Sequence, residues 1–336
     1  MVISSGDCGI TDNLAMPTPP SSPESALHLL VPFAAASDPA CQERMTGLAL
    51  PNLGSLLALL QAGETLAGDD YSFSTPHERA LARAIGLEGE DGRLPWAALA
   101  HPDIPGPQAW FHLCHFQVGM DQVQLVPANQ LDIQPDESAA LMQAIEPLCR
   151  EDGLTLTMDT PGRWHAQGPA LAGLRCASLD RVAGRSVDGW MATSPTDPQA
   201  ERWLRRLQNE AQMLFYTHPV NDAREARRAL TLNGFWADGA GSLSPGVMHK
   251  AAPEVADHLR QPALSADWSS WSQAWTALDA GPMARLLDAA RSGHPVTLTL
   301  CGERHARTWH GPVAGLGGLW RRLRGPSPVA PILQSL

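Results

Sequence analysis

The sequence predicts an α/β protein in which a core of buried strands and helices is joined to an α+β subdomain that contains a β-hairpin. A continuous apolar run, HLLVPFAAA at 28–36, is typical of a buried strand. Helix-start signals at Pro51 and Pro76 follow it along the chain. Further on, strand-like segments at 154–158 and 163–166 flank the turn DTPG, which indicates a hairpin.

The first part of the core is expected at 26–104. The helix that begins at Pro51 places several leucines on one face. The tetrapeptide TPHE at 75–78 is a capping box, and it predicts a helix that stops at Gly86. Residues 88–108 are loop-like apart from the short segment LPWAALA.

A cap-like subdomain is expected at 105–232. Alternating and aromatic residues predict strands at 109–117 and about 122–126, and a helix begins at Pro135. A long helix capped by Asp197 is followed by a His-Pro turn, a short Arg-rich helix, a strand and a Gly loop. The apolar residues of the long helix share one arc of its surface: Trp203, Leu204, Leu207, Ala211, Leu214 and Phe215.

The chain is expected to return to the core at 233–336. Tryptophans at 268, 271 and 275 recur at helical spacing, and another helix is predicted at about 282–291. The segments 296–301 and 305–310 predict a last hairpin, which precedes the basic amphipathic turn GGLWRRLRG. Residues 1–25, rich in proline and serine, are expected to be a disordered tail.

Composition argues against several classes of partner. The net charge of −11 weakens the case for broad binding to nucleic acid or to acidic membranes. No secretion signal and no membrane-spanning run of apolar residues is evident, so a cytoplasmic protein is expected. The six cysteines form no CxxC pair and predict reduced, mostly buried thiols, and the single lysine, Lys250, is a poor candidate for Schiff-base chemistry.

Two groups of polar residues are candidates for ligand binding. Asp180, Arg181 and Arg185 have the chemistry of either an ion-pair network between subdomains or an anion site, and the network is favoured. The second group lies between the long helix and the Gly loop. It comprises His218, a ligand or a helix C-terminal residue; Asn221, the expected cap of the next helix; Arg224, a partner for a carboxylate or phosphate; and Asn233, expected to bond a crossing backbone.

The best local set of metal-ligand residue types is His112, Cys114, His115 and Asp121. On a strand His112 and Cys114 share a face that His115 does not, so the set is more typical of core and edge residues than of a metal site. His305 and His310 are five residues apart on a predicted hairpin, which argues against shared ligation. The sequence therefore predicts no metal site.

The motif HPVN at 218–221, with Arg224, Asn233 and the GAG at 239–241, resembles the cofactor-independent phosphoglycerate mutases of archaeal type. The segment SLDRVAGRSVDGWM resembles another stretch of that family, with Asp180 and Gly184 at matching positions. The resemblance implies a reduced core of the alkaline-phosphatase type. It also implies that an active relative would use two manganese or zinc ions with clustered aspartates and histidines.

From His28 onward the chain is even more similar to a proteobacterial family of regulatory proteins, the RpfE family, often labelled phosphoglycerate mutase. HLLVPFA, PHERALARA, QNEAQMLFYTHPVNDARE and VTLTLCGERHA carry this resemblance. The metal-binding motifs of the mutases are missing: VPFA at 31–34 replaces the Asp-Gly after the first strand, and no Asp-x-x-Gly-His motif follows Gly241.

Three functions follow from the resemblance as expectations. The first is a non-catalytic regulatory or scaffolding protein that has lost the metal site, has a protein partner, and has no cofactor. The second is a metal-dependent phosphoglycerate mutase or phosphohydrolase, which alone would require manganese or zinc. The third is a partner subunit of a single-strand nuclease, which would connect the protein to nucleic acid only indirectly. A small anionic ligand is a further candidate partner, and no membrane partner is expected.

Overall fold

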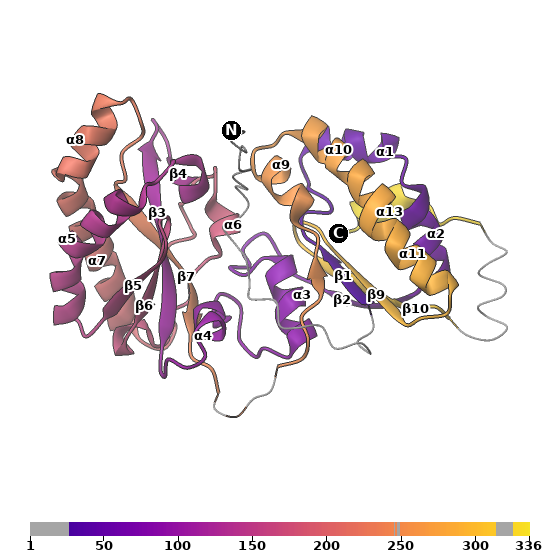
Figure 1. Cartoon of the computed structure of the whole chain (residues 1–336), viewed down its shortest axis with the longest axis horizontal. Coiled ribbons are helices and arrows are strands. Elements are labelled where there is room, and N and C mark those ends of the chain that lie inside the picture. The colour runs from indigo at the N-terminus through magenta and orange to yellow at the C-terminus, as the bar shows by residue number, and fades with distance from the viewer. Residues whose placement is uncertain (1–26, 245, 247–248, 314–324) are drawn as a thin grey trace, which may run out of the picture.

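The computed structural model describes residues 27–244, 246, 249–313 and 325–336, and it contains two separate β-sheets. Each sheet has its own helices, and the two units lie side by side (Figure 1). We call them the first unit, built on sheet 1, and the second unit, built on sheet 2. The predicted α/β class is confirmed.

Sheet 1 is mixed, with the strand order β2-β10-β9-β1-β8. The central strand β1 runs parallel to β8 and β9, whereas β10 is antiparallel to both β9 and β2. The predicted apolar strand and the last hairpin are therefore both confirmed. The strands are β1 (Leu27–Val31), β2 (Gln61–Leu66), β8 (Glu254–Val255), β9 (Val296–Cys301) and β10 (Ala306–Gly311).

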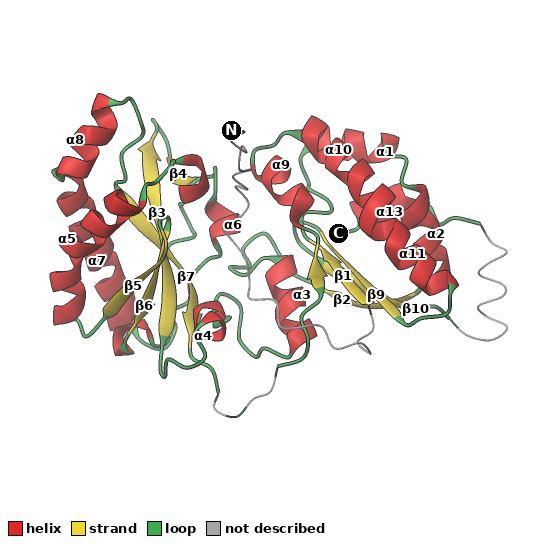
Figure 2. Ribbon diagram, in the orientation of Figure 1, coloured by secondary structure: helices red, strands yellow, loops and turns green. Residues whose placement is uncertain are grey.

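Helices cover sheet 1 mainly on one face, where they bury the largest apolar cluster of the unit (Figure 2). Trp271 and Trp275 lie in this cluster with no exposed surface, whereas Trp268, on the same predicted helix, is half-buried against it. The helices are α1 (Pro39–Gly47), α2 (Pro51–Leu59), α10 (Trp268–Leu278), the π-helical turn η4 (Asp279–Met283), α11 (Ala284–Arg291) and α13 (Val329–Gln334).

The opposite face of sheet 1 carries α3 (Pro76–Ile85), which packs Ala80 against Leu30 and Cys301. The capping box is present as predicted: the Thr75 hydroxyl accepts from the Glu78 backbone N–H, and the Glu78 carboxylate accepts from the Thr75 backbone N–H at 2.8 Å. A Gly at position 86 with φ of 75° ends the helix.

Sheet 2 is antiparallel and has the long strand β3 at its centre. β3 pairs with β7 along one side, and with β6 and β4 in succession along the other. The predicted β5–β6 hairpin is confirmed. The strands are β3 (Gln108–Val118), β4 (Val123–Pro127), β5 (Thr155–Thr160), β6 (Arg163–Gln167) and β7 (Gly234–Gly241).

Two long helices, α5 (Pro135–Glu151) and α7 (Pro198–Tyr216), bury the apolar face of sheet 2, and Asp197 caps α7 as predicted. The predicted apolar arc of α7 is correct except at Leu214, which is 37% exposed. The remaining short helices are α4 (Trp96–Ala100), α6 (Leu179–Val182), α8 (Pro219–Ala226), α9 (Arg260–Leu264) and the 3-10 turns η1 (Ala128–Gln130), η2 (Pro169–Leu171) and η3 (Asp257–Leu259).

The prediction of a Gly loop at 239–241 is wrong. These residues form the last part of β7, which pairs with β3 up to Gln108. Gly239, with φ of 61°, lies so close to Trp96 and Trp110 that a Cβ atom there would crowd both side chains. Because β7 belongs to sheet 2, the second unit extends beyond residue 232 to Gly241, whereas the division of the chain into independently folding domains stays a prediction.

Several expectations concern residues outside the described ranges: the tail at 1–25, Cys8, and the basic turn with Trp320, Arg321, Arg322 and Arg324. The other five cysteines are free and buried, as predicted. No helix in the described part of the chain is long and apolar enough to cross a membrane.

The half-buried His28 predicts a loss of stability in mild acid. Burial, together with the neighbouring His310, lowers the pKa of His28 to about 4. Between pH 6.5 and pH 4 the unfolded chain therefore binds a proton that the folded chain does not, so stability falls as the pH falls through this window. We expect His28→Asn to remove about 1–2 kcal/mol of the loss measured by urea unfolding between pH 7 and pH 5. His294→Asn, at an exposed histidine, is the control. If both variants lost the same stability between pH 7 and pH 5, the acid sensitivity would not come from His28.

Candidate functional site

The candidate site lies where the two units meet, at the carboxyl ends of the parallel strands β1 and β9. In open α/β sheets this end is where ligands usually bind, because loops that follow parallel strands converge there. From the first unit come the turns after both strands, the start of α3, and α9; from the second unit comes α6 (Figure 1).

Asp180 is the central charge of this interface. It lies in α6, whose cap is the side chain of Ser178, and it is only 5% exposed. Both of its carboxylate oxygens accept from Arg260 Nε, at 2.9 and 3.0 Å, and one also contacts Arg260 Nη2. His77 Nε2 lies 3.2 Å from Asp180 Oδ2. The second unit therefore inserts a carboxylate between two basic side chains of the first unit.

The pKa values follow from this pairing. Burial by itself would raise the pKa of Asp180, but Arg260 and His77 outweigh it and hold that pKa well below its usual range. The pKa of Arg260 changes in the opposite direction: burial lowers it, but the Asp180 carboxylate raises it by more, so the guanidinium stays charged. In two nearby carboxyl groups burial outweighs the basic neighbours: it raises the pKa of Glu78 by more than His77 lowers it, and that of Asp257 by more than Arg260 lowers it.

Arg181 and Arg185 also reach across to the first unit. The buried Arg181 donates to the backbone carbonyls of Glu303 at 3.2 Å and Ser74 at 3.4 Å. Arg185 Nη1 lies 3.5 Å from a carboxylate oxygen of Glu303, whose other oxygen accepts from the Ser37 backbone N–H at 2.9 Å. All three candidate residues therefore bond the first unit: Asp180 and Arg185 form ion pairs as predicted, whereas Arg181 donates to backbone carbonyls instead.

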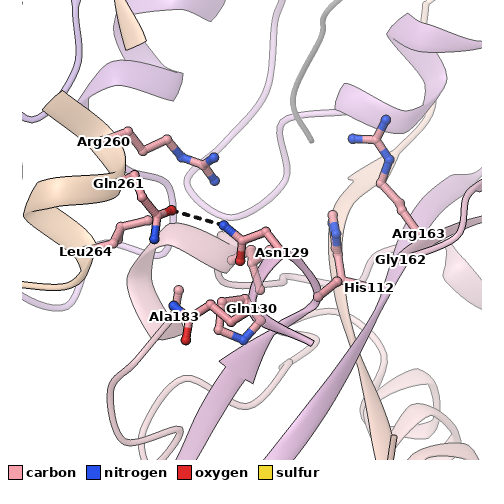
Figure 3. A pocket seen from close by; sticks show the side chains of 12 residues that line it. His112, Asn129, Gln130, Gly162, Arg163, Ala183, Arg260, Gln261 and Leu264 are labelled. Carbon is pink, nitrogen blue, oxygen red and sulfur yellow. Dashed lines mark hydrogen bonds between the residues drawn. The ribbon is translucent and has the colours of Figure 1, made fainter. Parts of the chain in front are cut away.

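Two small cavities flank the network. One, bordered by Phe33, His77, Arg181 and Glu303, has a volume of about 30 Å³. The other has the same volume and lies between α9 and the end of β4 (Figure 3). Such volumes accommodate only a few water molecules, so the two units meet in a nearly closed interface.

The second cavity is lined by polar groups that bond one another. Asn129 Nδ2 donates to Gln261 Oε1 at 3.0 Å, which links the two units directly (Figure 3). His112 Nε2 lies 2.9 Å from Asp238 Oδ1, and the other oxygen of Asp238 accepts from the Leu179 backbone N–H at 3.0 Å. Asp238 thus fixes the start of α6, the helix that carries Asp180.

The remaining candidates lie apart from this interface, within the second unit. Arg224 has no exposed surface and donates from Nε to the Leu230 carbonyl at 2.7 Å, from Nη1 to Glu137 at 2.6 Å, and from Nη2 to the Leu131 carbonyl. It therefore binds a carboxylate of its own unit, and no donor set open to an external phosphate is formed.

The expectation for Asn221 is wrong, and so is one of the two alternatives for His218, a helix C-terminal residue whose side chain bonds the last carbonyls. Asn221 is not a helix cap: it is buried inside α8, where its amide donates to the carbonyls of Phe215 and Leu232 and its oxygen accepts from the Leu232 N–H. His218 is the cap instead, because its Nδ1 accepts from the Val220 N–H at 3.2 Å, and it does not bond the last carbonyls of α7 through its side chain. The two roles are exchanged relative to the prediction.

Asn233 behaves as predicted. Its side-chain oxygen accepts from the Phe116 N–H at 2.7 Å and its amide donates to the Phe116 carbonyl at 3.0 Å, so it continues the pairing of β3 beyond the end of β7. Together with Asn221 it ties the HPVN motif to sheet 2 through backbone contacts.

The set of metal-ligand residue types on β3 does not converge. Cys114 is buried, and His115 Nδ1 bonds the Thr231 carbonyl at 2.9 Å, away from His112. Of the late histidines, His305 Nδ1 accepts from the Gly68 N–H, whereas His310 contacts Thr297. Among the described residues no group of three or more His, Cys, Asp and Glu side chains is arranged to hold a metal ion.

Sequence reasoning missed the partners of the candidate residues: His77, Asp238, Arg260, Glu303 and Glu137. The capping box placed His77 at the start of a helix, but nothing in the local pattern indicated what faced it. No local pattern marks Arg260, and Asp238 lies in a segment that the sequence predicts only as a strand.

No protein-family model matches the chain, and no curated protein matches it. Among solved structures it is similar to a cofactor-independent phosphoglycerate mutase from Thermoplasma acidophilum DSM 1728, with 13% identity, a TM-score of 0.36 and coverage of 93% of this chain and 100% of that one. It is also similar to the PH0037 protein from Pyrococcus horikoshii, with 13% identity, a TM-score of 0.44 and coverage of 86% and 88%, respectively.

Proposed function

We propose that the protein is a non-catalytic regulatory or scaffolding protein, descended from a phosphoglycerate-mutase-like ancestor, that works through a protein partner. The observation that carries the proposal is the pairing of Asp180 with Arg260 and His77 at the carboxyl ends of β1 and β9. A carboxylate that ligates a catalytic metal ion or exchanges a proton with a substrate needs oxygen lone pairs that no other group occupies. Here a buried guanidinium and an imidazole occupy it instead.

The turn after β1 supports the same proposal. Phe33 lies in this turn, within the segment VPFA that stands in place of the Asp-Gly of the resembling mutases, and its ring lies against His77 with centroids 5.1 Å apart. The backbone carbonyls of Phe33 and Ala34 accept from the indole N–H groups of Trp271 and Trp275, at 2.9 and 3.3 Å. The turn is therefore held by the apolar core of the first unit.

Metal content and mutase activity test the proposal together. We expect the purified full chain, dialysed against manganese or zinc, to retain far less than stoichiometric metal and to give no conversion of 2-phosphoglycerate to 3-phosphoglycerate above the protein-free rate. Metal analysis by mass spectrometry and a coupled assay measure the two quantities. Metal-dependent turnover that the Asp180→Asn substitution abolishes would overturn the proposal and favour the metal-dependent mutase or phosphohydrolase.

The nuclease-partner function rests on the sequence resemblance alone. It predicts that a single-strand nuclease copurifies with the tagged chain from its natural host, and that the complex binds single-stranded DNA in a salt-sensitive way. Copurification of other proteins without such a nuclease would remove this alternative and leave the regulatory or scaffolding function in place.

A further inference from the structure

The edges of the two sheets differ in how they are protected. The outer edge of β4 is bonded by the segment that follows α6: the Gly184 N–H donates to the Leu125 carbonyl at 2.8 Å, and the Val187 N–H to the Val123 carbonyl at 2.9 Å. β8 is only two residues long. An uncovered edge strand presents unpaired backbone donors and acceptors to any other strand, so most proteins shorten or cover such edges.

β5 is an edge strand without this protection. In the described part of the chain it pairs with β6 alone. Its side chains alternate between exposed and half-buried, and the half-buried Leu156 and Met158 pack against the core between sheet 2 and α5 and α7. One face of the edge is therefore apolar and incompletely covered, and the other face presents Thr155 and Thr157.

No unpaired charge on β5 would repel a second copy of the strand. The strand TLTMDT contains neither lysine nor proline, the residues that most often guard an edge. Its one charged residue, Asp159, is neutralised within the chain, because Arg163 Nε donates to its carboxylate at 2.6 Å. Two such strands can approach each other without placing unpaired like charges opposite one another.

We propose that β5 is a dimerisation edge, at which it pairs antiparallel with β5 of a second copy of this chain. A two-fold axis through Thr157 places Thr157 opposite its own counterpart and Leu156 opposite Met158, so that polar meets polar on one face and apolar meets apolar on the other. The inference is independent of whether the protein is catalytic.

The expected dimer is weak. A pairing of two six-residue strands buries less surface than the roughly 1,200 Å² at which stable complexes begin. We therefore expect a dimer dissociation constant in roughly the micromolar range. Sedimentation velocity of the full chain across a dilution series measures it.

Charge substitutions at the axis give the sharpest test. In Thr157→Lys and in Thr157→Glu two like charges face each other, and each variant alone should raise the dimer dissociation constant by about tenfold or more. An equimolar mixture of the two variants should restore dimerisation, because Lys then faces Glu across the axis. Thr65→Lys on β2, the same change on an exposed edge strand of sheet 1, is the matched control and should leave the constant unchanged.

Circular dichroism and the thermal midpoint should be the same for the wild type and all three variants, since positions 65 and 157 are exposed. A chain that stays monomeric at all concentrations, or a dimer that Thr157→Lys does not weaken, would overturn the proposal. A mixture that fails to recover would overturn it as well, because the strand facing β5 would then belong to something other than a second β5.

Discussion

Replacement of Asp180 by Ala is expected to lower the free energy of unfolding by about 3–5 kcal/mol. The carboxylate is buried with two basic partners, and its removal leaves the Arg260 guanidinium charged, desolvated and without its main acceptor. The loss of a buried partner costs more than the pair itself contributes. Urea unfolding followed by tryptophan fluorescence measures the change.

Asp188→Ala is the control for this prediction, because Asp188 is exposed in the same segment, and a change of less than about 0.5 kcal/mol is expected there. The double variant Asp180→Ala with Arg260→Ala should be less destabilised than the sum of the two single variants. Additive effects would mean that the ion pair does not couple the two units.

Arg224→Ala should have an effect of similar size within the second unit, about 3–5 kcal/mol. Its guanidinium has no exposed surface and satisfies the Leu230 and Leu131 carbonyls as well as the Glu137 carboxylate. The substitution leaves these acceptors without a donor and opens a void beneath α8. The thermal midpoint and the urea midpoint should both fall.

Arg227→Ala is the matched comparison, since Arg227 Nη2 bonds the same Glu137 carboxylate at 2.8 Å but its side chain is 43% exposed. An exposed ion pair contributes about 0–1 kcal/mol, so a small change is expected. If Arg224→Ala and Arg227→Ala lowered the free energy of unfolding equally, the burial of Arg224 would not explain its contribution to stability.

Local patterns predicted much of the fold. The TPHE box, the tryptophan spacing of α10, the cap of α7 and both hairpins were correct, because each depends on residues within one turn of a helix or one pair of adjacent strands. The β7 error has the same origin. A Gly-Ala-Gly sequence is locally typical of a loop, but here Gly241 pairs with Gln108 of β3, 133 residues earlier in the chain, and the segment is a strand.

The candidate site was predicted in part. The sequence predicts ion pairs for Asp180 and Arg185, and both are present. The partner Arg260, however, lies 80 residues away from Asp180 in sequence, and no local pattern joins them. The exchange of roles between His218 and Asn221 has a related cause. Asn221 is drawn inward because Phe215 and Leu232 present backbone groups that only the tertiary fold brings to it.

The backbone at Phe33 has a consequence for how this protein could change in evolution. Its φ of 55° is a left-handed conformation, which Asn and Asp adopt far more readily than a bulky aromatic residue does. Main-chain geometry would therefore accept an oxygen ligand at this turn after a single replacement. The side chains around it would not, because the Asp180 carboxylate is already bound to both His77 and Arg260. An Asp or Asn at position 33 would thus suit the backbone conformation, but the neighbouring Asp180 carboxylate would still be held by its basic partners.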